Sequence, residues 1–98
     1  MEASVAIQVL PLGKEKESVL NIVDEVIYRI EKSGLNYEVG PFETTVEGDL
    51  DTLMDLIKDI QKIAISAGAD ELATYIKLFY RPEGGVLTIH EKVDKHRK

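Results

Sequence analysis

Gly-Pro-Phe-Glu-Thr-Thr-Val-Glu-Gly-Asp, residues 40–49, contains a turn, a strand and a helix start within a single short stretch. The Gly-Pro pair is typical of a turn, and the aspartate behind the second glycine is a favourable helix N-cap. The strand between them is unusually polar, which predicts that it presents carboxylates and hydroxyls to a ligand or partner. Alternation divides it into Glu43, Thr45 and Glu47 on one face and Phe42, Thr44 and Val46 on the other.

The segments before this stretch predict a strand, a helix and a second strand. Residues 3–12 alternate with apolar side chains on both faces, as expected of a covered strand. Residues 18–33 carry an apolar stripe at helical spacing, with Ser18 as the predicted N-cap and Gly34 as the stop signal. Residues 35–39 form a short strand that makes a hairpin with the polar strand.

The segments after it repeat this order. Residues 49–67 show a second amphipathic helix, which Gly68 ends. Residues 71–81 alternate as the last strand. Thr88 and Glu91 have the spacing of a capping box, which predicts a short C-terminal helix over about 88–97.

The order β-α-β-β-α-β predicts an α+β fold of the ferredoxin-like type, formed by one domain over residues 1–98. Two crossover connections place both helices on one face of a four-stranded antiparallel sheet. Strands 3–12 and 42–48 are expected at its centre. The side chains expected to face the helices are Val5, Ile7, Val9, Phe42, Val46, Ile76 and Leu78.

Composition narrows the possible partners. The 18 acidic and 12 basic residues give a formal charge of −6, which disfavours nucleic acid and suits a small cationic ligand. The chain has no cysteine, so thiol chemistry and disulfides are excluded. Neither a leader pattern nor a membrane-length apolar run is present, and we expect a cytoplasmic protein without membrane partners.

The face of the sheet that the helices leave open mixes apolar and polar side chains. Leu10, Tyr75 and Phe79 would lie there beside polar groups that include Gln8, and this mixture suggests stacking of two sheets into a dimer. A groove at that stack would suit a polar heteroaromatic ligand. The alternative is an ordinary exposed strand in which Glu47 and Lys77 form a cross-strand ion pair.

No group of residues in the sequence indicates catalysis. His90 and His96 are six apart on the predicted tail helix, which is not a same-face spacing for a metal pair. Glu43 and Glu47 would lie about 13 Å apart along a strand, too far for a tight acid–base pair. Gly84-Gly85 lacks the surroundings of a phosphate loop. We therefore predict a protein that is not an enzyme.

Three motifs carry a family resemblance that covers residues 3 to about 93. The chain resembles the small thiamine-binding proteins of the MTH1187/YkoF type. The motifs are Ile7-Gln8-Val9-Leu10-Pro11, Ser33-Gly34-Leu35-Asn36-Tyr37-Glu38-Val39-Gly40-Pro41 and Thr44-Thr45-Val46-Glu47-Gly48.

The resemblance implies a ferredoxin-like fold that assembles into dimers and tetramers through the sheets. It also implies binding of thiamine or its hydroxymethylpyrimidine part without catalysis, and no cofactor other than this ligand. The expected contacts are Gln8, Thr44, Thr45 and Glu47, with Tyr37 or Tyr75 stacking on a ring. Two other functions stay open: a ligand-sensing regulatory module, and an enzyme acting on a thiamine precursor.

Overall fold

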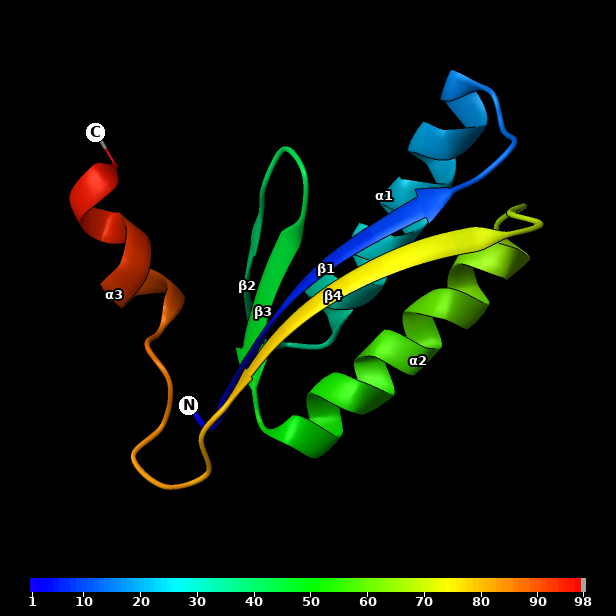
Figure 1. Ribbon diagram of the computed structural model, residues 1–98. Coiled ribbons are helices and arrows are strands. Elements are labelled where there is room, and N and C mark those ends of the chain that lie inside the picture. The colour runs from blue at the N-terminus through cyan, green and yellow to red at the C-terminus, as the bar shows by residue number, and fades with distance from the viewer. Residues whose placement is uncertain (98) are drawn as a thin grey trace.

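A computed structural model describes residues 1–97 and confirms the ferredoxin-like fold (Figure 1). The sheet is antiparallel in the order β2-β3-β1-β4, so β1 and β3 are central as predicted. The predicted domain end, Lys98, lies outside the described residues. The elements are β1 (Ala3–Pro11), α1 (Lys16–Lys32), β2 (Asn36–Val39), β3 (Thr44–Gly48), α2 (Leu50–Ser66), β4 (Leu72–Tyr80), α3 (Ile89–Val93) and a 3-10 turn (Asp94–His96).

The helices α1 and α2 lie on one side of the sheet, and α3 stands apart from them beside β2 and β3 (Figure 1). Ile22, Val26 and Ile30 recur every four residues on α1 and are buried, because this spacing returns each side chain to the same helix face. The matching stripe on α2 and the odd-numbered residues of β1 complete the core. Its largest fully buried side chains are Ile22, Ile30, Leu53, Leu56, Ile60, Val5 and Val46.

Two predicted element starts are wrong. The helix α1 begins at Lys16 with Glu15 in the N-cap position, so Ser18 lies inside the helix. The strand β3 begins at Thr44, two residues later than predicted. Gly40 N–H donates to the Glu43 carbonyl at 2.9 Å, so residues 40–43 form the hairpin loop. Phe42 therefore lies in that loop with 79% of its surface exposed, and its predicted place in the core is wrong.

The strand β4 is less covered than the sequence predicts. Ile76 and Leu78 share the helix side of the sheet with Ile7 and Val5, as expected, but remain 43% and 44% exposed. Every residue of the second half of β4, from Tyr75 to Tyr80, is exposed. This strand forms one edge of the sheet, and its outer half has protein on one flank only.

The C-terminal tail crosses the open face of the sheet. Its capping box is confirmed: Thr88 accepts from Glu91 N–H at 3.1 Å, and the Glu91 carboxylate accepts from Thr88 N–H at 2.9 Å. These hydrogen bonds from Thr88 hold the pKa of Glu91 below its ordinary value. The loop leading to the tail is tied to the start of the chain, where Val86 N–H donates to the Met1 carbonyl at 2.7 Å.

Candidate functional site

A notch opens where β1 continues past the beginning of β3. The register between these strands ends at the pair Ile7–Thr44, whereas β1 runs on to Pro11 against β4. The β2–β3 loop, the end of β1 and the apolar face of α1 enclose a cavity of about 220 Å³. Two of the sequence-predicted contacts, Gln8 and Thr44, meet in its lining.

Thr44 supplies a hydroxyl to the notch from the helix side of the sheet. Its residue surface is 8% exposed, so the notch is its route to solvent. Within residues 1–97 neither the Thr44 hydroxyl nor the Gln8 amide takes part in a hydrogen bond. The Thr44 hydroxyl is therefore free to contact a ligand in the notch, whereas the Gln8 side chain starts from the open face of the sheet.

Val9 adds a backbone donor and acceptor. The main-chain groups of Glu2 and Leu12 form hydrogen bonds with residues at the two ends of β4. Because this direction alternates along a strand, the backbone N–H and C=O groups of even-numbered β1 residues point toward β4 and those of odd-numbered residues point toward β3. Ile7 is the last odd residue with a β3 partner, and Val9 is the next. Its N–H and C=O consequently point toward the notch, where no strand residue within the described chain pairs with them.

The remaining walls are apolar. Val19 and Val23 of α1, with Val39 and Phe42 of the hairpin, enclose the notch. A volume of about 220 Å³ is below the roughly 300–1,000 Å³ of pockets for drug-sized ligands, so it suits a single ring better than a two-ring molecule. The arrangement can hold a flat heteroaromatic ring through apolar contacts and a few directed hydrogen bonds.

Glu43 stands at the rim of the notch as its acidic group. It forms an ion pair with Lys77 across the sheet at 3.0 Å, and its side chain is 34% exposed. The expected alternative, a Glu47–Lys77 pair, is wrong because Lys77 lies opposite Ala6 and reaches the loop instead. A cation at the rim would compete with Lys77 for this carboxylate.

Thr45 and Glu47 lie on the open face, as predicted, but away from the notch. Thr45 is half-buried and pairs with Ala6. Glu47 is only 3% exposed because the tail covers it. Its carboxylate accepts from Asn36 Nδ2 at 2.5 Å and from Ile89 N–H at 2.9 Å, so both oxygens are already engaged by the protein.

Tyr37 lies on the helix side of the sheet, opposite to the face that carries Thr45 and Glu47. It pairs with Val46 and packs against the core cluster, so it does not approach Gln8 or Thr44 in the notch. Tyr75, the second predicted ring-stacking residue, is 61% exposed and lies opposite Gln8. The structure thus brings together Gln8 and Thr44 and separates them from the other three predicted contacts.

Sequence reasoning missed Val9 and Phe42 as parts of this site, whereas it named Glu43 as a carboxylate that would favour the cationic ring. The signal for Val9 was strand length, since β1 spans nine residues and β3 only five. The turn signal Gly40-Pro41 could have placed Phe42 in the loop, because a loop of four residues ends at Glu43. Side-chain alternation alone does not show which backbone N–H and C=O groups lack a strand partner.

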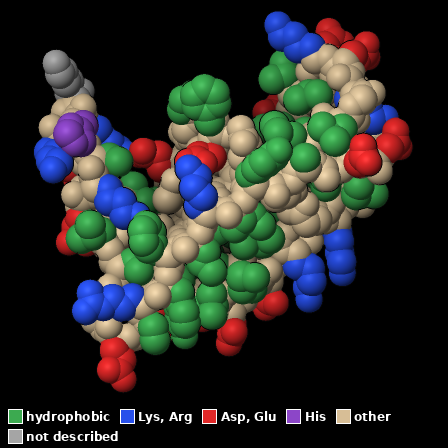
Figure 2. All heavy atoms as spheres, viewed as in Figure 1, with side chains coloured by type: hydrophobic (Ala, Val, Ile, Leu, Met, Phe, Trp, Pro, Cys, Tyr) green, Lys and Arg blue, Asp and Glu red, His purple; other side chains and the backbone are tan. Residues whose placement is uncertain are grey.

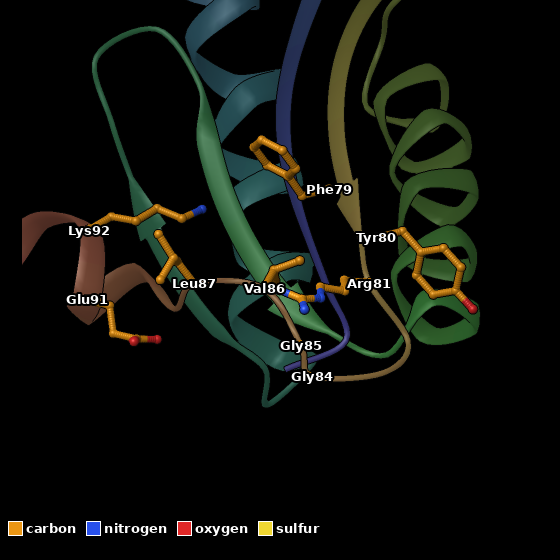
Figure 3. A pocket seen from close by; sticks show the side chains of 9 residues that line it. All are labelled: Phe79, Tyr80, Arg81, Gly84, Gly85, Val86, Leu87, Glu91 and Lys92. Atoms are coloured by element: carbon orange, nitrogen blue, oxygen red, sulfur yellow. The ribbon is translucent and has the colours of Figure 1, made fainter.

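A second, larger hollow of about 590 Å³ separates the end of β4 from the tail. Figure 3 shows Phe79, Val86, Leu87 and Lys92 around it, with Tyr80 turned away to the other side of β4. The Nζ atom of Lys92 lies 5.8 Å from the centre of the Phe79 ring. We do not assign the ligand to this hollow, because the sequence-predicted contacts lie outside its lining.

Within residues 1–97 no three His, Asp or Glu side chains are grouped so that they could hold a metal ion. No helix in this range combines the length and apolar character needed to cross a membrane.

Comparison with known proteins defines the class as a thiamine-binding one. The family model for thiamine-binding proteins matches residues 5–97. The chain is 43% identical to a UPF0045 protein of Clostridium perfringens over 94 residues, 96% of each chain. It is 31% identical over 71 residues to a UPF0045 protein of Methanothermobacter thermautotrophicus, covering 71% of this chain and 72% of the relative.

Two solved structures support the same family assignment. A Thermotoga maritima protein, provisionally named for thiamine biosynthesis/salvage, superposes with a TM-score of 0.86 at 35% identity, over 97% of this chain and 98% of its own. A Bacillus cereus domain named DUF77 gives 0.85 at 44% identity, over 98% and 90%. The chain belongs to the thiamine-binding protein family, the MTH1187-like group that the sequence motifs predicted.

Proposed function

We propose that the protein binds thiamine or its hydroxymethylpyrimidine part without turnover, and that the pyrimidine ring enters the notch between β1 and β3. The observation that carries this proposal is the convergence of free polar groups in an otherwise apolar cavity. These groups are the Thr44 hydroxyl and the backbone N–H and C=O of Val9, and Gln8 lies beside them in the lining. An aminopyrimidine offers donors and acceptors along one edge, which such a set can meet.

The cationic thiazolium of thiamine would lie outside the notch, near Glu43 at the rim. The cavity volume of about 220 Å³ supports this division of the ligand, with one ring inside and one outside. Thiamine is a cation, and a carboxylate within a few ångströms favours it. Because Glu43 already pairs with Lys77, we expect this attraction to be modest.

Binding rather than catalysis is the better-supported class. The matching family is named for binding, and the notch holds a hydroxyl and backbone groups but no histidine, with Glu43 as its one carboxylate. A hydroxyl becomes an activated nucleophile only beside a general base, and the one carboxylate here, Glu43, is already paired with Lys77.

The expected sheet-stacked homo-oligomer remains part of this proposal. The tail already covers Glu47 on the open face, and Leu10, Tyr75 and Phe79 remain exposed there. A second copy stacked on this remaining area would cover apolar surface that a monomer leaves in water.

Calorimetric titration with hydroxymethylpyrimidine and with thiamine tests the proposal. Thr44→Val removes the notch hydroxyl with little change of shape, and one lost hydrogen bond of about 0.5–1.5 kcal/mol lowers the affinity roughly 2- to 12-fold. Thr45→Val is the matched control, since its hydroxyl lies on the open face. No heat with either compound refutes the function, and equal loss in both variants refutes the position of the site.

A further inference from the structure

The hollow between the end of β4 and the tail has the dimensions of a ligand site. Its volume of about 590 Å³ falls within the roughly 300–1,000 Å³ that is typical of small-molecule pockets. Within the described chain it shares no lining residue with the notch. In Figure 2 basic side chains lie beside hydrophobic ones over the tail and the loop that leads to it. The hollow therefore differs from the notch in the charge of the ligand that it suits.

The apolar walls of the hollow come from two segments of the chain. Phe79 belongs to β4, and Val86 and Leu87 lie on the loop that leads to α3 (Figure 3). Phe79 and Leu87 are 70% and 60% exposed, so the single chain leaves much of both side chains in water. A flat apolar group bound against them would remove part of this surface from water, which is favourable.

Arg81 supplies an oriented cation at the sheet side of the hollow. Its Nε donates to the Glu83 carbonyl at 3.1 Å, and a Cβ at Gly84 would lie 3.3 Å from its Cζ. The side chain is therefore folded back over its own loop, where glycine leaves room for it. Within residues 1–97 its two terminal nitrogens form no hydrogen bond or ion pair. A guanidinium held in this way can offer paired N–H donors to a carboxylate or phosphate.

Lys92 supplies a second cation from the tail. It forms no ion pair within the described part of the chain. Figure 3 shows Lys92 and Arg81 extending into the space between the tail and the sheet from opposite sides. The one carboxylate in the described lining, Glu91, already accepts from Thr88 N–H at 2.9 Å in the capping box. Two cations against one carboxylate make the lining positive, although the whole chain has a formal charge of −6.

We propose that this hollow binds a small organic anion with a flat apolar body, namely an aromatic carboxylate or an aromatic phosphate ester. The anionic group lies between Arg81 and Lys92, and the ring packs against Phe79 and Leu87. Thiamine is unsuited to this position, because its cationic ring would meet two further cations. The protein thus has two sites for ligands of opposite charge.

Calorimetric titration of the native protein with phenyl phosphate, benzoate and inorganic phosphate tests this proposal. Binding of phenyl phosphate, of benzoate or of both supports it and identifies the anionic group that the hollow accepts. The affinity should fall as salt is added, because the two cations are exposed. Inorganic phosphate lacks the ring and should bind roughly tenfold more weakly than phenyl phosphate. Equal affinity for these two phosphates, or no heat with any of the three compounds, overturns the proposal.

Charge-removing variants test the two cations separately. Arg81→Gln and Lys92→Gln should each lower the affinity for the better-binding aromatic anion roughly 3- to 10-fold, since each removes one contact to the anionic group. Arg81→Lys should recover only part of the loss, because an ammonium keeps the charge but lacks the paired donors. Lys58→Gln is the matched control, since it makes the same change of net charge at an exposed position of α2. Equal affinities in the Arg81→Gln, Lys92→Gln and Lys58→Gln variants overturn the proposal.

A notch variant separates this hollow from the proposed thiamine site. Thr44→Val should leave the affinity for the aromatic anion unchanged, because Thr44 lines the notch and not the hollow. A loss in Thr44→Val as large as that in Arg81→Gln would place the anion in the notch and overturn the proposal. This comparison does not depend on thiamine, so a protein that binds the anion but gives no heat with thiamine refutes only the proposed function.

Discussion

Glu47→Gln is the substitution that most directly tests how the tail is held. Glu47 was expected to contact the ligand, but its two oxygens accept hydrogen bonds from Asn36 and from the first residue of α3, Ile89. We therefore expect this variant to loosen the tail while leaving thiamine binding unchanged. Glutamine keeps the shape of the side chain and removes its charge, so the effect reports on the charge-assisted bonds.

The expected magnitude follows from these two bonds. Asn36 can turn its amide to present oxygen to the new NH₂ group, and Ile89 N–H can still donate to the remaining carbonyl, so both bonds persist in neutral form. Bonds to a charged group contribute about 1.5–3 kcal/mol and neutral ones about 0.5–1.5 kcal/mol. After allowing for easier burial of the neutral side chain, we expect a loss of about 1–3 kcal/mol.

Amide hydrogen exchange is the assay, because it measures local opening of the tail separately from unfolding of the whole domain. A loss of 1.4 kcal/mol corresponds to a factor of ten, so the Ile89 amide should exchange roughly tenfold faster. Glu43→Gln is the matched control: its ion pair with Lys77 is partly exposed and contributes at most about 1 kcal/mol. Unchanged exchange at Ile89, or a loss of thiamine binding in Glu47→Gln, would refute the reasoning.

Two further predictions concern backbone conformation and pH. Gly85→Ala should lower the free energy of unfolding by about 1–3 kcal/mol in urea denaturation, because φ is +77° and a Cβ would lie 2.7 Å from the Met1 carbonyl oxygen. Gly13→Ala, at φ +69° with open space around it, should lose less, and an equal loss would mean that the Met1 contact does not matter. The lowered pKa of Glu91 means that its capping bond stabilises α3 above its ordinary pKa of 4.5 and is lost as the pH falls through the lowered folded value. The chemical shift of the Thr88 amide in nuclear magnetic resonance should follow this titration. If the same pH-dependent change of shift persists in Glu91→Gln, the titration belongs to another group.

The sequence predicted the architecture well, because each element carries its own local signal. The stripe Ile22, Val26 and Ile30 requires a helix, Gly34 ends it at φ +75°, and Thr88 with Glu91 forms the expected capping box. Successive residues within each of these signals are at most four apart. The element order then leaves few ways to cover the sheet, and the ferredoxin-like arrangement is the one that forms.

The candidate site was only partly predictable. Gln8 and Thr44 were identified, but the sequence does not show that β3 stops short of β1, which is what opens the notch. It also does not show that the tail returns across the open face, because the contact between Glu47 and Ile89 joins positions far apart in the chain. Glu47 therefore resembled a ligand contact, although the folded chain supplies its partners.

The strand β3 has a consequence for how the chain can vary in length. Thr44 at its start faces the notch and Glu47 near its end faces the tail, and their odd spacing places them on opposite sides of the sheet. Inserting or deleting one residue between them would send one of the two groups to the wrong side. Changes of length should instead accumulate in the hairpin loop at residues 40–43, where an added residue reshapes the notch but leaves the anchor of the tail in place.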